Sequence, residues 1–62
     1  MDNIIMQITV LKDTNINLKA NDILYPVTFD DITLYYHSDS RTYIGIEMIL
    51  NNPKIFRIDY KE

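Results

Sequence analysis

The sequence predicts an all-β fold: a small five-stranded antiparallel barrel or a strongly twisted antiparallel sheet. Three successive segments, residues 23–29, 32–37 and 42–50, alternate apolar residues with others. The residues that separate them, 30–31 and 38–40, are Asp and Ser, which favour turns. Alternation with a period of two, interrupted by turns, is typical of an antiparallel meander with one buried face.

The composition indicates a single small domain, expected to span residues 1–62. A chain of 62 residues buries only about 60% of the surface that it exposes when unfolded, so its stability margin is thin. It has no cysteine, so neither a disulfide nor a thiolate metal site can supplement the core. Hydrophobic residues make up 47% of the chain, which excludes the disordered class. Stability must therefore come from close packing or from self-association.

The charge pattern argues against several classes of partner. The formal net charge is -3, and the six Lys and Arg residues are scattered without a basic run. Binding to a phosphate backbone draws its affinity from clustered basic residues, so nucleic acid is an unfavoured partner. No apolar stretch is long enough to span a membrane, and residues 1–6 lack the positive start of a signal peptide. We therefore expect a cytoplasmic protein without membrane contact.

The residue usage indicates an AT-rich coding sequence. It leans to Ile, Asn, Tyr and Lys, with one Gly, one Ala and no Trp. We interpret this bias as a sign of a low-GC bacterium, or of one of its phages or mobile elements.

Residues 4–11 are expected to form the first strand, because they are rich in β-branched and other apolar side chains. Residues 12–22 form the longest polar connection, with Asp and Asn residues that make turns by bonding their own backbone. Ile16 and Leu18 lie two positions apart within it. We expect this loop to fold back with both side chains tucked beneath it.

The turn at residues 30–31 sets the register of the second and third strands. Counting back from it pairs Phe29 with Ile32, Val27 with Leu34, and Tyr25 with Tyr36. All of these residues share one face, which we expect to be the buried face. Pro26 lies on the opposite face and has no N–H, which indicates that its strand is at an edge or bulged there.

The loop at residues 38–40 leaves two registers open for the fourth strand. A three-residue loop pairs Tyr35 with Tyr43, and a loop two residues longer places Tyr35 opposite Gly45. Either register keeps Tyr35 and Tyr43 on the face opposite the expected core. The alternation predicts that the fourth strand continues to Leu50.

A single 3₁₀-like turn near residues 51–53 is expected to end the fourth strand. A direct hairpin would set Glu47 opposite Asp59, a like-charge pair that costs roughly 0.2–1 kcal/mol. We therefore expect residues 55–60 to form a final strand that pairs with the first strand and closes the sheet.

One local segment resembles a known family. Residues 18–24, Leu-Lys-Ala-Asn-Asp-Ile-Leu, resemble the end of the long loop in SH3-like domains, which is usually Leu, a short spacer, Gly-Asp and an apolar strand. Asn21 stands where Gly is usual, and Asn also tolerates a left-handed backbone. The predicted order of strand, long loop, three-strand meander, short turn and final strand is likewise that of an SH3-like barrel. The resemblance implies this fold.

The peptide-binding signature of eukaryotic SH3 domains does not carry over. The chain has no Ala-Leu-Tyr-Asp-Tyr segment, no Trp at the start of the third strand, and no Pro-x-x-Tyr in the turn. The resemblance therefore implies no groove for Pro-rich peptides. SH3-like barrels serve many purposes in bacterial and phage proteins, so the fold does not choose the function.

His37 is the only histidine and the obvious candidate for a general base. Catalysis needs an orienting partner and a nucleophile or substrate within hydrogen-bond reach. The neighbouring residues 38–40 have the simpler role of making a turn. Together with Asp39, His37 would offer a metal at most two ligands, fewer than a closed structural site needs. We expect no enzymatic activity, no catalytic residue, no metal site and no cofactor.

The acidic residues of the loops allow a plain and a functional interpretation. Asp is simply a favoured turn residue, and solvated loops explain its positions. The same carboxylates can also form a patch that receives a basic partner or mimics nucleic-acid phosphates. The residues concerned are Asp13, Asp22, Asp30, Asp31 and Asp39.

The expected contact surface lies on the face opposite the presumed core. An exposed group of tyrosine and aliphatic side chains marks protein contact more often than nucleic-acid binding, which normally comes with basic neighbours. Alternatively, the loop over residues 12–22 covers this face. The predicted partner-binding residues are Tyr35, Tyr43, Glu47 and Ile49, with Asp30 and Asp31 at the rim.

The function expected from these features is a small non-enzymatic protein-binding module. Its concrete form is a phage or mobile-element accessory protein that binds a host or competitor protein and modulates or inhibits it. One alternative is an acidic nucleic-acid mimic that inhibits a DNA- or RNA-processing enzyme. Another is binding of single-stranded nucleic acid through surface tyrosines. A homodimer formed through an uncovered strand edge is also possible.

Overall fold

The protein is an antiparallel five-stranded sheet with one short helix, in a computed structural model that describes residues 4–61. The sheet order is β4-β3-β2-β1-β5. The predicted all-β, five-stranded antiparallel fold is therefore confirmed. The elements in chain order are β1 Ile4–Val10, β2 Ile23–Phe29, β3 Ile32–His37, β4 Thr42–Gly45, α1 Ile46–Asn51 and β5 Phe56–Lys61.

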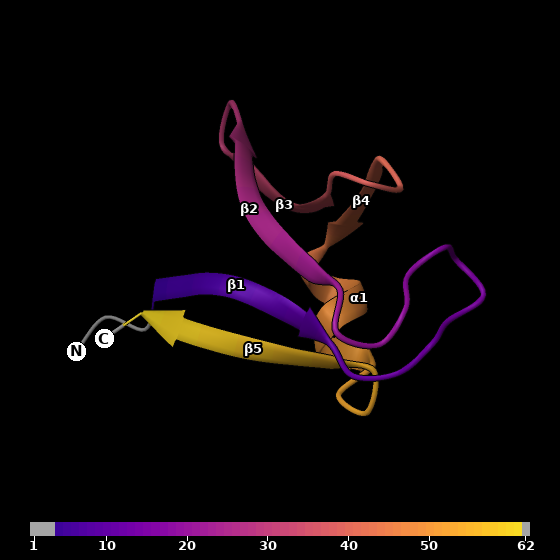
Figure 1. Ribbon diagram of the computed structural model, residues 1–62. Helices are drawn as coiled ribbons and strands as arrows, with labels where there is room; N and C mark the ends of the chain where they lie inside the picture. Colours follow the sequence, from indigo (N-terminus) through magenta and orange to yellow (C-terminus); the bar gives the residue numbers. More distant parts are fainter. Residues whose placement is uncertain (1–3, 62) are drawn as a thin grey trace.

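Strand β2 connects two parts of the sheet. Its first two residues, Ile23 and Leu24, pair with β1, whereas the rest of the strand pairs with β3. Figure 1 shows β1 and β5 running side by side, with β2, β3 and β4 rising away from them and α1 at the junction. At Pro26 the strand pairs with β3 alone. Counting from the two-residue turn, Pro26 and Tyr35 form a non-hydrogen-bonded pair, so the position of the missing N–H points away from β3 and faces no partner strand. This agrees with the predicted edge position of Pro26.

The final strand closes onto the first. β5 pairs antiparallel with β1 from Ile4 opposite Lys61 to Val10 opposite Phe56. The register shifts between Ile5 and Gln7, where one residue of β1 is bulged. The predicted pairing of the first and last strands is confirmed.

The hairpin of β2 and β3 has the predicted register, with Phe29 opposite Ile32 and Tyr25 opposite Tyr36. Of the two turn residues, Asp30 has a φ of 52° and Asp31 does not have a positive φ. A positive φ at the first central position is common to the primed turns, whose twist suits a hairpin. The residue pair Asp-Asp can form this turn without glycine.

Strand β4 is shorter than the alternation predicts. It ends at Gly45, and a helix of six residues follows in place of the expected strand to Leu50. The helix ends with a bond of the 3₁₀ type from the N–H of Asn52 to the carbonyl oxygen of Ile49, 3.2 Å long. The predicted continuation of the strand to Leu50 is wrong.

Local chemistry explains the helix. Glu, Met and Leu favour helix over strand, and Glu47 lies in the first turn, where a negative charge is favourable. The three-residue spacing of Ile46 and Ile49 sets both side chains against the core. Leu50, the last residue of the predicted strand, is 60% exposed at the end of the helix. The residue pattern of this segment fits both the two-residue period of a strand and the 3.6-residue period of a helix. The packing of Ile46 and Ile49 against the core selects the helix.

The turn over residues 38–41 also differs from both predicted registers. His37 pairs with Thr42, and Tyr35 pairs with Ile44. This register lies halfway between the two that the sequence left open, and Arg41 accommodates it with a φ of 54°. Because the facing alternates at each residue, the change places Tyr43 on the opposite face from Tyr35.

On β2 and β3 the core therefore lies on the face that was predicted to be exposed, whereas Ile44 of β4 is buried as predicted. Tyr35 is only 5% exposed, whereas Tyr25 and Ile32, predicted to face inward, are 57% and 63% exposed. The predicted orientation of the β2–β3 hairpin is wrong. The buried core combines side chains from every element: Ile8, Val10, Leu18, Leu24, Tyr35, Ile44, Ile49 and Phe56.

The long connection between β1 and β2 supplies part of this core. Leu18 is fully buried, and Ile16 packs against the cluster, as predicted. The Thr14 hydroxyl holds the fold-back, because it accepts from the N–H of Leu18 at 3.3 Å and donates to the Leu18 carbonyl at 2.9 Å. Asn17 and Asn21 adopt left-handed backbone conformations within the loop.

Replacement of Leu18 by Ala should destabilise the protein by about 2–5 kcal/mol, because it leaves a cavity in a core that has few members. Leu50→Ala is the matched control, and its cost should stay within about 0.5 kcal/mol because Leu50 is exposed. Urea unfolding followed by far-UV circular dichroism measures both. Equal stabilities of the two variants would contradict the role assigned to the loop.

Candidate functional site

The predicted contact residues divide between the surface and the core. Tyr35 and Ile49 are buried, because Tyr35 turns toward the junction of the two parts of the sheet and Ile49 lies on the inner side of α1. These two residues cannot contact a partner, and their predicted exposure is wrong. The remaining members are exposed: Tyr43 in β4, Glu47 in the first turn of α1, and Asp30 and Asp31 in the β2–β3 turn.

The side of β2, β3 and β4 that points away from the core carries a continuous group of apolar side chains. We call this group the outer face. The register sets Tyr25, Tyr36 and Tyr43 side by side across the three strands. No charged residue points to this side of these strands. Its members are Tyr25, Val27, Phe29, Ile32, Leu34, Tyr36 and Tyr43.

The aromatic rings of the outer face contact one another. The rings of Tyr36 and Tyr43 are tilted, with 4.5 Å between their centroids. The ring of Phe29 meets that of Tyr43 edge to face at 5.7 Å, although β3 separates their strands. Edge-to-face and offset arrangements are the favoured geometries of aromatic pairs. The outer face is thus an ordered cluster.

The outer face is large for such a small chain. A large aromatic side chain offers roughly 150–250 Å², so the half-exposed Tyr25, Phe29 and Tyr43 each present roughly 100 Å². With Ile32, the exposed apolar area is on the order of 400 Å², which is comparable to the largest patch of a typical monomer. Patches of this size mark contact surfaces more often than inert ones.

Charges occur only at the ends of the outer face. Asp30 and Asp31 lie in the turn at one end of the β2–β3–β4 unit, and both are exposed. The turn at the other end carries Arg41 and Asp39, which are exposed as well. An uncharged centre with charges at its rim is the usual composition of a protein interface.

A second cluster joins the long loop to the β3–β4 turn through His37. One Asp22 carboxylate oxygen, Oδ2, lies 3.4 Å from His37 Nε2 and accepts a hydrogen bond of 2.8 Å from the N–H of Lys19. On the other side of the ring, His37 Nδ1 lies 2.7 Å from the Ser40 hydroxyl. Neither the approach of Asp22 nor the contact of Ser40 with the ring has a signal in the sequence.

These contacts place a carboxylate, an imidazole and a hydroxyl in a chain of neighbouring groups, the arrangement that nucleophilic catalysis requires. Other features favour a structural role. The Ser40 hydroxyl is also 2.7 Å from Thr42 Oγ1, so it is shared within the turn. His37 itself is almost fully buried, and the depression described below is lined by other residues. We assign the cluster to holding residue 22, at the end of the long loop, against the β3–β4 turn.

Asp59 is the centre of a polar network on β1 and β5. Its Oδ2 accepts hydrogen bonds from the Thr9 hydroxyl at 2.6 Å and from Gln7 Nε2 at 3.2 Å, and its Oδ1 accepts one from Arg57 Nε at 2.9 Å. The hydrogen bond from Thr9, followed by that from Arg57, lowers the pKa of Asp59 below its usual value. The network links strands at opposite ends of the sequence.

Burial changes the titration of Tyr35. Desolvation raises the pKa of its hydroxyl, and the charge of Tyr60 at high pH raises it further. Tyr35 is thus a core residue with a polar tip, not the surface residue that the sequence predicts.

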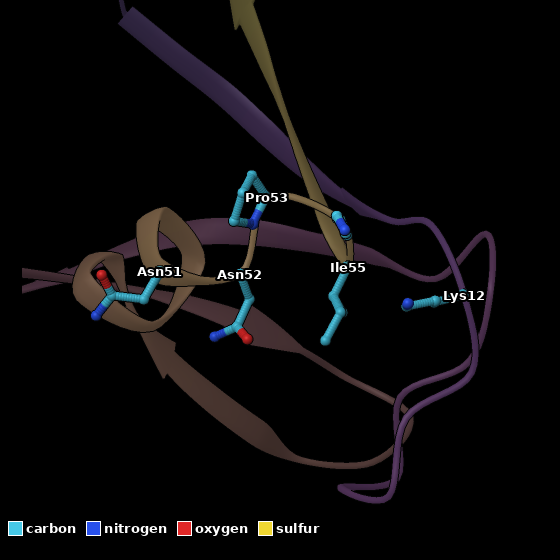
Figure 2. Close-up of a pocket in the computed structure, with 6 residues that line it drawn as sticks. Lys12, Asn51, Asn52, Pro53 and Ile55 are labelled. Carbon is cyan, nitrogen blue, oxygen red and sulfur yellow. The ribbon is translucent and has the colours of Figure 1, made fainter.

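A shallow depression of about 360 Å³ lies beside the end of α1. Figure 2 shows the Lys12 side chain pointing across it toward Ile55, with Asn51 on the helix. Asn52 uses its side-chain amide to bond the Met48 carbonyl at 2.8 Å. The C-terminal end of a helix carries partial negative charge, so the nearby lysines complement it. The depression is lined by Lys12, Asn51, Asn52, Pro53, Lys54 and Ile55.

Residues 4–61 lack two further features. These residues contain no group of three or more His, Cys, Asp or Glu side chains placed to hold a metal ion. Within the same range, no helix has the length and apolar content needed to cross a membrane.

Comparison with known proteins adds no assignment: no family model, curated protein or solved structure matches this chain.

The outer face was present in the sequence as a pattern, although its direction was misassigned. Both sides of β2 and β3 carry apolar residues, and alternation alone predicts that the richer side is the core. The polar pair Thr28 and Thr33, whose hydroxyls lie 3.2 Å apart, belongs to the inward-turning side at its exposed end. The register of β4, set by the turn at residues 38–41, and the packing of β1 and α1 against Leu24 and Tyr35 distinguish the two sides.

Asp59→Asn should reduce stability at neutral pH, because the amide loses the charge that Thr9 and Arg57 stabilise. The folded state lowers the pKa of Asp59, so its contribution is present above the unfolded-state pKa and is lost as the pH falls through the folded-state value. Urea midpoints of the variant and the parent should therefore converge in acid. Asp31→Asn, in an exposed turn, is the control and should follow the parent. A difference between Asp59→Asn and the parent that persists unchanged in acid would contradict this account.

Proposed function

We propose that this protein is a small non-enzymatic protein-binding module with an SH3-like arrangement of strands, and that the outer face is its contact surface. The observation that carries the proposal is the ordered, uncharged aromatic cluster on β2, β3 and β4. Leaving roughly 400 Å² of clustered apolar side chains in water gives no advantage to an isolated chain. The strand order and the helix before the last strand support the SH3-like arrangement.

The proposed contact surface keeps part of the set expected from the sequence. Tyr43 lies in the aromatic cluster, and Asp30 and Asp31 lie at its rim. Tyrosine and phenylalanine are enriched at interface centres because they combine a large apolar area with few rotatable bonds. The acidic turn at residues 30–31 favours an orientation in which basic groups of the partner lie over that end of the outer face.

The biological setting that we propose is that of a phage or mobile-element accessory protein. Its role there is to bind a host or competitor protein and to modulate or inhibit it. The support is the small size, the net charge of -3 and the residue usage of an AT-rich coding sequence.

Binding of single-stranded nucleic acid is less well supported. Bases stack on exposed aromatic rings, but such platforms track the phosphates with basic side chains. No Lys or Arg belongs to the outer face, and Arg41 stands at its end beside Asp39. Protein contact therefore fits this surface better.

Tyr43→Ala should abolish capture of a specific protein from an extract of a low-GC bacterium, while leaving the far-UV spectrum unchanged. Tyr60→Ala is the matched control, because Tyr60 is exposed to a similar extent but lies on β5. Immobilised protein and mass spectrometry of the retained fraction give the readout. Equal capture by the two variants would remove the outer face as the contact surface.

A further inference from the structure

We infer that the outer face is covered by a second copy of this chain, so that the protein forms a two-fold symmetric dimer through β2, β3 and β4. The inference rests on the proposed role of this face as a contact surface. It names the occupant of the face in the free protein, which a target protein then displaces. Three observations carry it: the missing charge at the centre, the arrangement of charge at the two ends, and the small core of the single chain.

The centre of the outer face suits contact with its own copy. In a two-fold interface the same patch faces itself, so any charge at the centre would meet a like charge. Tyr36, Leu34 and Val27 occupy the centre, and none of them is charged. Tyr43 and Tyr25 flank Tyr36, so aromatic rings of two copies can interdigitate without burying an unpaired charge.

The ends of the outer face complement each other. Asp30 and Asp31 lie at one end, and Arg41 lies at the other with Asp39 beside it. When two copies pack face to face with their strands antiparallel, the acidic turn of each copy lies over the Arg41 end of its partner. This arrangement keeps the two acidic turns apart and brings Arg41 toward the partner's acidic turn, whereas a parallel arrangement would set two acidic turns together. Because Asp39 balances the charge of Arg41, the orientation is fixed mainly by avoiding the like-charge contact.

The most exposed members of the outer face supply about half of the area that a standard interface buries. The four most exposed members offer on the order of 400 Å² per copy, and the partly covered Val27, Leu34 and Tyr36 with the flanking turns lie within the same footprint. A standard interface buries about 800 Å² per partner. A chain whose core is small and which has no cysteine gains stability from such burial.

The strand edges offer a poorer route to association. Edge strand β4 is only four residues long and runs directly into α1. Edge strand β5 carries Arg57, Asp59 and Lys61 at alternating positions. Short edges and charged edges are the features by which proteins prevent strand addition. Face-to-face packing is therefore the route that this structure favours over an edge-to-edge dimer.

The test is sedimentation equilibrium of the full chain over a wide concentration range. The parent protein should shift from monomer toward dimer mass as concentration rises. Tyr25→Lys should raise the dissociation constant of the dimer at least about tenfold, because it buries a charge between two apolar faces. Tyr60→Lys makes the same change in charge at a tyrosine of similar exposure, 50% against 57%, and should leave the constant within about twofold of the parent.

A second variant guards against loss of folding in Tyr25→Lys. Ile32→Lys alters the most exposed apolar member of the outer face and should dissociate the dimer in the same way. Orientation is tested by Arg41→Glu, which should weaken the dimer, and by its combination with Asp30→Lys and Asp31→Lys, which should restore it. A combination no stronger than Arg41→Glu alone overturns the two-fold arrangement.

Monomer mass at every concentration overturns the inference, and so does a dimer that Tyr60→Lys dissociates while Tyr25→Lys does not. The proposed function is tested separately. If the protein is monomeric and Tyr43→Ala loses the captured partner, the proposed function is supported and the dimer is contradicted. If Tyr25→Lys disrupts a dimer and no other protein is retained in the capture experiment, the dimer is supported and binding to another protein is contradicted.

Discussion

The packing of Tyr35 between the two parts of the sheet determines what this protein presents to its surroundings. Tyr35 turns toward the junction with Leu24 and Ile44, where β1, β5, α1 and the long loop meet. Because strand side chains alternate, this choice commits every neighbouring residue of β2, β3 and β4 to one side or the other. The richest apolar side is left outside. Both the contact surface and the inferred dimer follow from that single orientation.

The loop and the turns show how few residues hold this orientation in place. Leu18 fills the core from the long loop, and His37 connects that loop to the β3–β4 turn through Asp22. Within residues 4–61, no buried side-chain oxygen or nitrogen lacks a hydrogen-bond partner. The polar groups that the fold encloses are therefore satisfied, so the exposed aromatic cluster is the feature that the isolated chain leaves unexplained.

Much of the fold could be predicted from the sequence, because period-two alternation and turn residues are local signals. They gave the strands, the register of β2 with β3, and the position of the loop side chains Ile16 and Leu18. The pairing of the first and last strands followed from excluding a like-charge pair. Asn21 adopts the left-handed backbone that its place in the loop motif suggested.

The remaining features depend on packing that alternation cannot show. The register of β4 against β3 differs by one residue from both predicted registers, so Tyr35 shares the buried face with Ile44 and not the exposed face with Tyr43. The left-handed backbone of Arg41 that allows this register has no signal in the sequence. The segment after Gly45 fits a strand and a helix equally well by pattern, and its helical form depends on burying Ile49. Two apolar sides on one sheet leave the direction of the core undetermined until a third element packs against one of them.

Single cysteines placed in this cysteine-free chain test the orientation of the sheet most directly. Ile32→Cys and Ile44→Cys alter the same residue type at 63% and 5% exposure, on opposite sides of the β2–β3–β4 unit. At protein concentrations low enough to keep the chain monomeric, thiol labelling of Ile32→Cys should proceed at nearly the rate seen in denaturant, and that of Ile44→Cys should be many times slower. Rapid labelling at position 44 with protection at position 32 would contradict the orientation on which the structure and its proposed function depend.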